Sequence, residues 1–283
     1  MNNKILAVIF FLTSIFIGVC NDIITKYLGS NLDSLEVVFF RFLFATIILL
    51  PFAFKKNVSL STSNPKIHLL RGFLLFGGIW IWSHSLSHIN VATATVINFT
   101  IPIFTLILAR LVLKEKVCKW RIIATFSGFI GVVIIANKPG NFDNIVLFVL
   151  FASFMFAVLD IVNKKYVVKE SLIAMLLYSN LATLLFTIPF LIGDFVMPTE
   201  KQLVLLFILG AGANMLLYFL LKAFALADAS YLVPFRYTEI LIAGLMAYIF
   251  FGEKLHDNTI IGALFIIPST LFISYRASKN KEV

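Results

Sequence analysis

Two arginines and a glutamate lie inside long apolar stretches of this 283-residue chain. Arg41 stands among phenylalanines, and Arg236 and Glu239 are three residues apart, so they share a face if their segment is helical. A charge at the centre of a membrane costs about 2.5–3.5 kcal/mol and therefore usually faces a cavity or a partner. Opposite charges that line a cavity would bind a zwitterion. The alternatives are an ion pair between helices and, for Arg41, a place at the outer interface beside Glu36.

Aromatic and amide side chains accompany these charges. Trp80 and Trp82 alternate along one apolar stretch, and each is expected either in a binding site or at the membrane interface, where tryptophan is common. Asn98 lies within another apolar stretch. Because lipid would leave its amide without hydrogen-bond partners, Asn98 is expected to face protein or a cavity.

A repeat at an offset of 138 residues carries two further charged pairs, since Asp22 and Lys26 recur as Asp160 and Lys164. Each lysine follows its aspartate by four residues, which favours pairing along a helix end. The alternative is a role as matched gates at the two faces of a membrane. Other matches at this offset are Thr100 with Thr238 and Glu115-Lys116 with Glu253-Lys254.

The composition is typical of a membrane protein. Hydrophobic residues make up 60% of the chain and charged residues 13%, against about a quarter charged in soluble domains, and the mean hydropathy is +1.00. The net charge of +9 comes from basic residues spread between the apolar stretches, which argues against nucleic-acid binding. No catalytic motif stands in a plausible context, and Cys20 and Cys118 lack metal-ligand spacing. The sequence therefore predicts neither an enzyme nor a bound metal or cofactor.

Apolar stretches of about 20 residues predict ten membrane-spanning helices, five in residues 1–140 and five in residues 141–283. Because five is odd, the second half begins on the opposite side of the membrane. We therefore expect an all-α integral membrane protein of two inverted five-helix repeats, a transporter layout with the site between the repeats. The predicted spans are 5–26, 35–54, 68–87, 91–112, 120–137, 143–163, 171–192, 202–221, 229–250 and 258–275.

The basic residues predict the orientation. With the N-terminus inside, seventeen of the 23 lysines and arginines lie on the cytoplasmic side and only four on the outer side. The positive-inside rule therefore predicts a multi-pass protein of the cell inner membrane with both termini in the cytoplasm.

Three of the candidate site residues interrupt the repeat. Arg41, Trp82 and Glu239 have no like residue 138 positions away. Residues that repeat suit a shared scaffold, so substrate contacts are expected where the two halves differ.

Five segments give the chain a resemblance to a known family. They are residues 21–27, 36–42, 101–104, 159–165 and 234–239. With two five-helix repeats, each having a Glu-Lys pair after its fourth span, the chain resembles the EamA branch of the drug/metabolite transporter superfamily. Within that branch the segments are similar to the S-adenosylmethionine uptake transporters of intracellular bacteria.

The resemblance implies a secondary transporter that imports S-adenosylmethionine by alternating access. Exchange for a related metabolite is one option for this transport. This substrate has a carboxylate, an ammonium, a sulfonium and an adenine, so its site needs a cation, an acid and aromatic faces. Arg41 or Arg236 would meet the carboxylate, and Glu239 the ammonium or the sulfonium. The candidates for stacking on adenine are Trp80, Trp82, Phe99 and Tyr237.

Two other functions stay open at this point. One is an EamA-type exporter of amino acids or other small metabolites; the other is a non-transporting membrane protein such as a lipid scramblase or a sensor. A cavity that both Arg236 and Glu239 face would favour zwitterionic substrates, whereas a lipid-facing polar groove would favour the non-transporting protein. The expected partners are a small molecule and membrane lipid. Oligomeric state and the choice among proton coupling, exchange and passive flow stay open.

Overall fold

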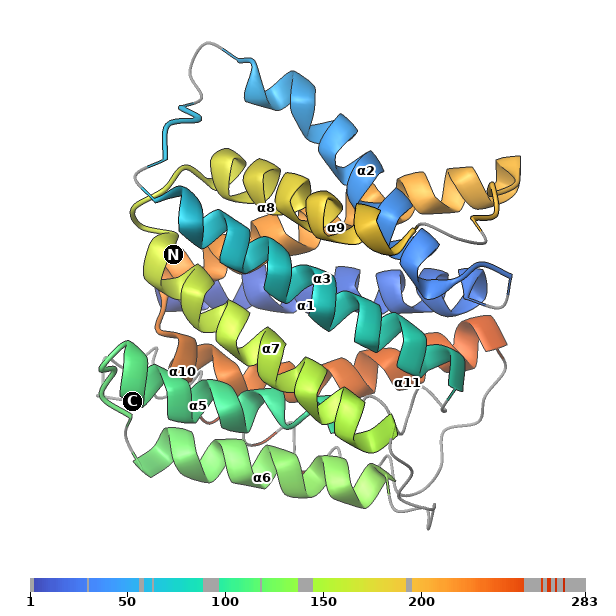
Figure 1. The fold of residues 1–283 in the computed structure, drawn as a ribbon. Helices are drawn as coiled ribbons and strands as arrows, with labels where there is room; N and C mark the ends of the chain where they lie inside the picture. The colour runs from blue at the N-terminus through green and yellow to red at the C-terminus, as the bar shows by residue number, and fades with distance from the viewer. Residues whose placement is uncertain are drawn as a thin grey trace.

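The computed structural model describes residues 3–29, 31–55, 59–62, 64–88, 97–117, 119–136, 145–191 and 195–251, with five single positions beyond them. All regular secondary structure among these residues is helical, and the helices lie side by side across the view in Figure 1, with α2 near the top and α6 at the bottom. The elements are α1 (Asn3–Leu28), α2 (Ser34–Ala53), α3 (Pro65–His88), α5 (Ile101–Val112), α6 (Lys119–Ala136), α7 (Ile145–Tyr166), α8 (Leu172–Thr187), η1 (Ile188–Phe190), α9 (Glu200–Leu226), α10 (Ala229–Leu232), η2 (Val233–Tyr237) and α11 (Thr238–Phe251).

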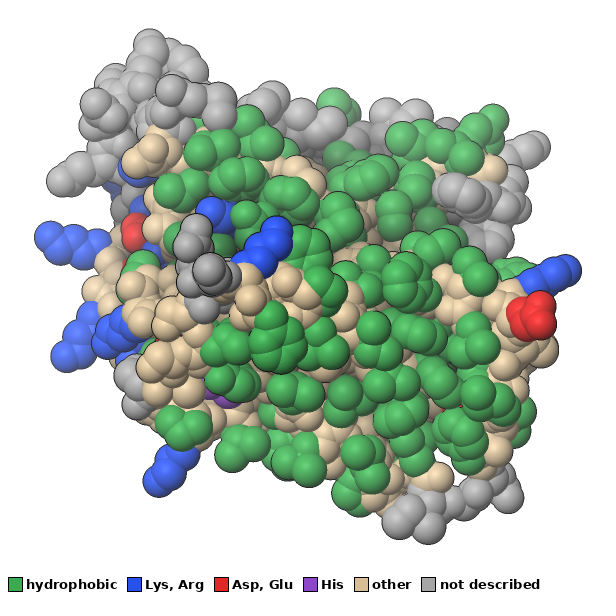
Figure 2. All heavy atoms as spheres, turned by 90° about the horizontal axis from the view of Figure 1, so that it is seen from above, with side chains coloured by type: hydrophobic (Ala, Val, Ile, Leu, Met, Phe, Trp, Pro, Cys, Tyr) green, Lys and Arg blue, Asp and Glu red, His purple; other side chains and the backbone are tan. Residues whose placement is uncertain are grey.

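The outer surface fits a lipid environment. Five of the described helical segments are long and apolar enough to cross a bilayer, namely α1, α2, most of α7, α8 continued by η1, and α9. Figure 2 shows a face whose middle is covered by hydrophobic side chains, while lysines and arginines gather mostly at one end. Exposed apolar side chains such as Ile47, Leu185 and Phe207 come from three different helices. An apolar surface this broad indicates contact with lipid.

The predicted spans coincide with helices wherever the structure describes them, except that two spans are interrupted. In the fourth, residues 97–98 are helical, a turn follows, and α5 begins at Ile101; residues 91–96 lie outside the described residues. The ninth, 229–250, consists of the short helix α10, the 3-10 turn η2 and the helix α11. The tenth, 258–275, is described at single helical positions only.

Prolines explain these two interruptions and also the change from α8 to the 3-10 turn η1 at the end of the seventh span, 171–192. Pro102, Pro189 and Pro234 each occupy one of the first two positions of α5, η1 and η2 respectively. Proline has no backbone N–H and its ring collides with the preceding turn, so it is tolerated at the start of a helix and breaks an interior. The break at Pro234 falls just before Arg236 and Glu239 and places these two side chains on different elements.

The start of α2 accounts for Glu36, which the sequence suggested as a companion of Arg41. Asp33 accepts a hydrogen bond from Leu35 N at 2.8 Å, and Glu36 accepts one from Asp33 N at 3.3 Å, which together form a capping box. Glu36 also accepts a 2.5 Å hydrogen bond from Val196 N. Its oxygens are thus used at the end of the helix, and Arg41 lies further along α2, away from this cap.

The two halves of the chain are interleaved. Helix α1 packs on α9, α3 packs on α7 and α8, and α2 packs on α8 and α9. Two glycines permit the close approaches: a Cβ on Gly72 would come within 2.9 Å of Thr183 N, and one on Gly210 within 2.8 Å of Ala45 N. Gly72 and Gly210 are 138 residues apart, and so are Ala45 and Thr183. The same contact is therefore made twice, once by α3 on α8 and once by α9 on α2.

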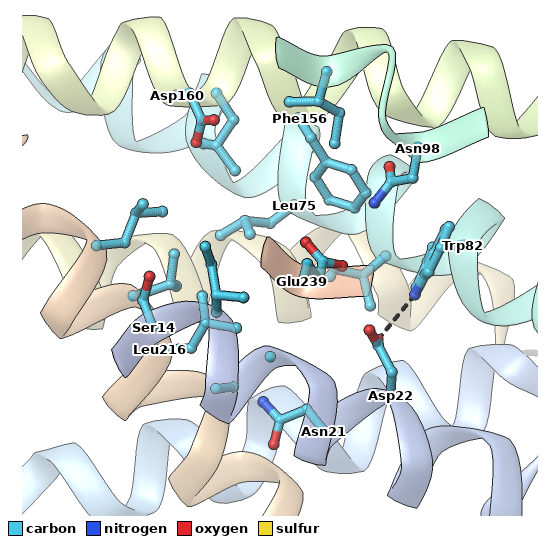
Figure 3. A pocket seen from close by; sticks show the side chains of 18 of the residues that line it. Ser14, Asn21, Asp22, Leu75, Trp82, Asn98, Phe156, Asp160, Leu216 and Glu239 are labelled. Carbon is cyan, nitrogen blue, oxygen red and sulfur yellow. Dashed lines mark hydrogen bonds between the residues drawn. The ribbon is translucent and has the colours of Figure 1, made fainter. Parts of the chain in front are cut away.

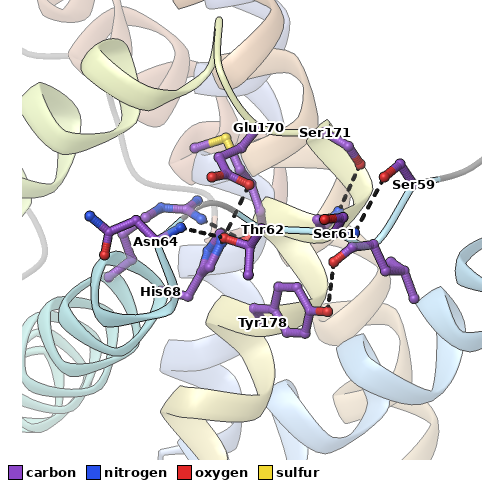
Figure 4. A network of polar contacts seen from close by, with 12 residues as sticks. Ser59, Ser61, Thr62, Asn64, His68, Glu170, Ser171 and Tyr178 are labelled. Carbon is purple, nitrogen blue, oxygen red and sulfur yellow. Dashed lines mark hydrogen bonds and ion pairs between the residues drawn. The ribbon is translucent and has the colours of Figure 1, made fainter.

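A polar network joins α3 to the second half at one end of the bundle. Arg71 is fully buried, donates to Asn163 Oδ1 at 2.8 Å and to Met175 O at 2.6 Å, and thereby links α3 with α7 and α8. Figure 4 shows the neighbouring contacts, in which His68 lies between Thr62 and Glu170. These contacts attach the segment before α3 to the α7–α8 connection.

Arg71 is predicted to support stability. In Arg71→Met, Asn163 Oδ1 and Met175 O lose a buried donor, and a buried group left without a partner costs about 1–3 kcal/mol. We expect a lower melting temperature for the detergent-solubilised variant than for the wild type. Arg110→Met removes an exposed arginine and is the matched control. Equal melting temperatures of the two variants would contradict the assignment.

Candidate functional site

A cavity of about 150 Å³ lies between the two halves of the chain. Side chains from α1, α2, α3, α5, α7, α9, η2 and α11 line it, and the close-up in Figure 3 shows them converging. Five charged residues are among them: Asp22, Arg41, Asp160, Arg236 and Glu239. Trp82 and Asn98 also line the cavity. Seven of the residues singled out in the sequence are thus gathered around one space.

Asp160 and Arg236 form an ion pair across the cavity wall. Arg236 Nη2 donates to Asp160 Oδ2 at 2.6 Å, joining η2 to α7. The guanidinium also lies over the ring of Phe11, 5.7 Å from its centroid. The expectation that Asp160 pairs with Lys164 along α7 is therefore wrong, and Arg236 does not pair with Glu239 either. Arg236 and Glu239 line the same cavity and attract each other, but the direct contact of Arg236 is with Asp160 on α7.

Asp22 is held from α3. Trp82 Nε1 donates a 3.0 Å hydrogen bond to Asp22 Oδ1, drawn as the dashed line in Figure 3. Asp22 also lies close enough to Arg41 for electrostatic attraction. The carboxylate of Asp22 is thus reached by a tryptophan from another helix, and pairing of Asp22 with Lys26 along α1 stays a prediction. Lys26 lies in the last turn of α1.

Arg41 and Glu239 differ from the other charges because their polar groups have no direct partner. Within the part of the chain that the structure describes, neither side chain forms a hydrogen bond or an ion pair. Arg41 is 7% exposed, its Nε is buried without an acceptor, and its guanidinium lies 5.9 Å from the centroid of the Phe42 ring. In Figure 3, Glu239 lies between Asp22 on one side and Asp160 on the other. Arg41 and Glu239 are thus the cation and the anion of the cavity that have no polar contact with the described residues.

Three predicted substrate contacts lie away from the cavity lining. Trp80 stacks on Phe76 and Phe190, with ring centroids 5.7 and 5.9 Å apart. Phe99 and Tyr237 are buried against each other, 5.6 Å between centroids. Alternation along α3 directs Trp80 and Trp82 to different faces, and only Trp82 faces the cavity. Trp80, Phe99 and Tyr237 support the wall by packing.

Lys164 holds the junction between α9 and α10. Its ammonium donates to the carbonyls of Phe224 and Ala227, both at 2.7 Å, at the end of α9. At the start of α10, Glu115 accepts from Ala229 N and Ser230 N, both at 3.0 Å. A cation at a helix C-terminus and an anion at a helix N-terminus both satisfy groups that the helix leaves unpaired. Elements of both halves therefore meet at this junction.

Aromatic residues near the charges were missed in the sequence. Phe156 lines the cavity beside Glu239 and Asn98, and Phe11 and Phe42 line it beneath the two arginines. Phe156 stands four residues before Asp160, so the helical period alone would have placed both on one face. The other two had no signal in a chain with 31 phenylalanines.

Most lining positions occur in pairs 138 residues apart. Equivalent positions of the two halves therefore surround the same space, but most pairs differ in chemistry. The pairs are Gly18 with Phe156, Asn21 with Leu159, Asp22 with Asp160, Leu75 with Ala213, Ile79 with Leu217, Trp82 with Leu220, Asn98 with Arg236 and Ile101 with Glu239.

No group of three or more His, Cys, Asp or Glu side chains that could hold a metal occurs among the described residues. The charged groups of the cavity form an arrangement for binding, with cations, anions and aromatic rings around a central space.

Comparison with known proteins identifies relatives over almost the whole chain. Residues 5–137 and 144–275 each match the model of the EamA-like transporter family. An S-adenosylmethionine uptake transporter of Rickettsia prowazekii is 45% identical, covering 95% of this chain and 92% of the relative. The protein of that description from Rickettsia bellii is 46% identical over 95% of this chain and 93% of its own. A crystal structure at 13% identity superposes with a TM-score of 0.83 over 98% of this chain and 99% of that chain, which shows a shared fold.

The ion pair between Asp160 and Arg236 is testable by a double-mutant cycle. Removing one partner of a buried pair leaves the other charge uncompensated and costs about 3–5 kcal/mol. We expect Asp160→Asn and Arg236→Gln each to lower the melting temperature in lipid nanodiscs, and the double variant to lose less than the sum of the two. Glu200→Gln, at an exposed helix start, is the control. Additive losses would mean that the two side chains are not coupled.

Proposed function

Because the chain belongs to the EamA-like transporter family, we propose that it is the carrier that imports S-adenosylmethionine across the cell inner membrane by alternating access. The observation that carries the proposal is a cavity lined by Arg41 and Glu239, whose charged groups have no hydrogen bond or ion pair with other described residues, in a chain 45% identical to an S-adenosylmethionine uptake transporter. The chain is a multi-pass membrane transporter and not an enzyme.

The cavity is chemically suited to this substrate. Arg41 is the only lining guanidinium without a carboxylate in hydrogen-bond contact among the described residues, and its planar donors fit the substrate carboxylate. Asp22, within attraction of Arg41, takes the neighbouring ammonium. The face of Trp82 receives the adenine. Asn98 also lines the cavity; its Oδ1 accepts from Ser153 at 3.1 Å, so we assign its Nδ2 as a donor to the substrate.

Two inverted repeats of five spans each, residues 1–140 and 141–283, would account for which helices contact each other. Exchanging each helix for its counterpart (α1 for α7, α2 for α8, α3 for α9, α5 for α11) converts the contact of α1 with α9 into that of α7 with α3. It likewise converts α2 with α9 into α8 with α3, and α5 with α7 into α11 with α1. The paired lining positions follow the same rule, which supports a site on the pseudo-twofold axis that such transporters use.

The gates would be the places where the two repeats meet beyond the cavity. Lys164 and Glu115 hold the α9–α10 junction against α7 and the α5–α6 segment. Both lie on the side with most basic residues, which the positive-inside rule makes cytoplasmic. Opening to the cytoplasm requires Lys164 to leave the carbonyls of α9. The bond from Trp82 to Asp22 is the corresponding link towards the other end.

Uptake of labelled S-adenosylmethionine into proteoliposomes tests the function. We expect saturable uptake, and Arg41→Gln is expected to reduce it about tenfold or more because the substrate carboxylate loses its cation. Vesicles loaded with unlabelled substrate or with S-adenosylhomocysteine separate exchange from net import. Arg110→Gln, an exposed arginine, is the control. Absence of saturable uptake under every loading condition would refute the assignment.

Cysteine labelling tests the orientation. In a background with Cys20 and Cys118 replaced by serine, Lys201→Cys is expected to react with a membrane-impermeant maleimide on intact cells, because it lies at the outer start of α9. Ser61→Cys is expected to react only after permeabilisation. The opposite pattern would place the termini outside.

A further inference from the structure

The charges that line the cavity do not balance. In their ionised forms, three carboxylates (Asp22, Asp160 and Glu239) face two guanidiniums (Arg41 and Arg236), which leaves a formal charge of −1. Asp160 and Arg236 neutralise each other through their 2.6 Å contact. Asp22 and Arg41 attract each other. Glu239 is thus the carboxylate that has no cation in direct contact among the described residues, although Arg236 attracts it and Asp22 repels it over a longer range.

S-adenosylmethionine has the opposite imbalance. Its carboxylate and ammonium are attached to one carbon and form a neutral zwitterion, which matches the opposite charges of Arg41 and Asp22. Its methylated sulfur adds one positive charge, so the molecule is a monocation. A ligand with charge +1 neutralises a cavity with charge −1, and in a low-dielectric site this matching is worth far more than in water.

A sulfonium can be recognised only by electrostatics and aromatic faces, because it has no N–H or O–H to donate. Glu239 supplies a carboxylate with no hydrogen bond or ion pair among the described residues, and Figure 3 shows Phe156 beside it. The rings of Phe11 and Phe42 are already covered by guanidiniums. Phe156 thus offers a ring to the sulfonium that no guanidinium covers among the described residues, in the same cavity lining as Glu239.

We infer that Glu239 receives the sulfonium charge and thereby distinguishes S-adenosylmethionine from S-adenosylhomocysteine, the neutral thioether that remains when the methyl group is lost. This inference rests on the proposed function. It assigns different groups to the two ends of the substrate: Arg41 and Asp22 recognise the amino-acid end shared by both compounds, whereas Glu239 recognises the charge that only one of them has.

The ratio of the two affinities measures this recognition directly, because the compounds differ only in the methyl group and its charge. Binding of labelled S-adenosylmethionine to the purified protein in nanodiscs, competed by each unlabelled compound, gives both affinities. We expect the wild type to prefer S-adenosylmethionine, and Glu239→Gln to reduce the ratio about tenfold or more. Since the variant binds the labelled compound weakly, its affinities are also measured by calorimetry. Glu239→Asp keeps the charge and is expected to retain the preference.

Each result has one interpretation. An unchanged ratio in Glu239→Gln, or equal wild-type affinities for the two compounds, would overturn the inference while leaving the transporter assignment intact. The wild-type comparison needs no variant and so stands even if Glu239→Gln fails to fold. If a folded Glu239→Gln variant loses affinity for both compounds by the same factor, Glu239 contacts the amino-acid end that the compounds share, and the inference is overturned. If the wild type binds neither compound, the proposed function itself is wrong.

Discussion

A charged side chain among membrane helices must be paired or must face a space where a ligand can reach it, and the centre of this protein is arranged around that requirement. Asp160 and Arg236 satisfy it by direct contact, at 2.6 Å, between α7 and η2. Asp22 satisfies it through Trp82. Arg41 and Glu239 line the cavity and form no hydrogen bond or ion pair within the described part of the chain. The pairing of some charges thus defines which ones are left for a substrate.

The ninth span is broken where it meets the cavity. Arg236 lies in the 3-10 turn η2 that contains Pro234, and Glu239 lies in the first turn of α11. Arg236 is in direct contact with Asp160, whereas the Glu239 carboxylate forms no hydrogen bond or ion pair with the described residues. An interrupted helix at the middle of a membrane protein is tolerated where it lines a cavity, because polar groups can be satisfied there.

Interleaving of the halves couples the site to the rest of the molecule. The close approaches at Gly72 and Gly210 occur between helices of different halves, and Arg71 joins α3 to α7 and α8. A movement of one half therefore changes contacts with the other along the whole bundle. The cavity lies at the centre of these contacts, so a change in its charge balance on substrate binding acts on both halves at once.

The sequence alone determined much of this protein. Apolar length predicted where the described helices lie, the 138-residue offset predicted which positions are equivalent, and the cost of charges in lipid singled out Arg41, Arg236 and Glu239. Local spacing failed for the pair Asp160–Lys164, because Asp160 contacts Arg236 and Lys164 contacts the end of α9. Among the aromatic candidates, Trp80, Phe99 and Tyr237 pack against other rings outside the cavity lining. Which charges pair across helices, and which stay free, was decided only by the tertiary structure. The physical reason is that spacing along one helix determines only which side chains share a face. The partners on that face come from other helices: Trp82 is 60 residues from Asp22, and Arg236 is 76 residues from Asp160.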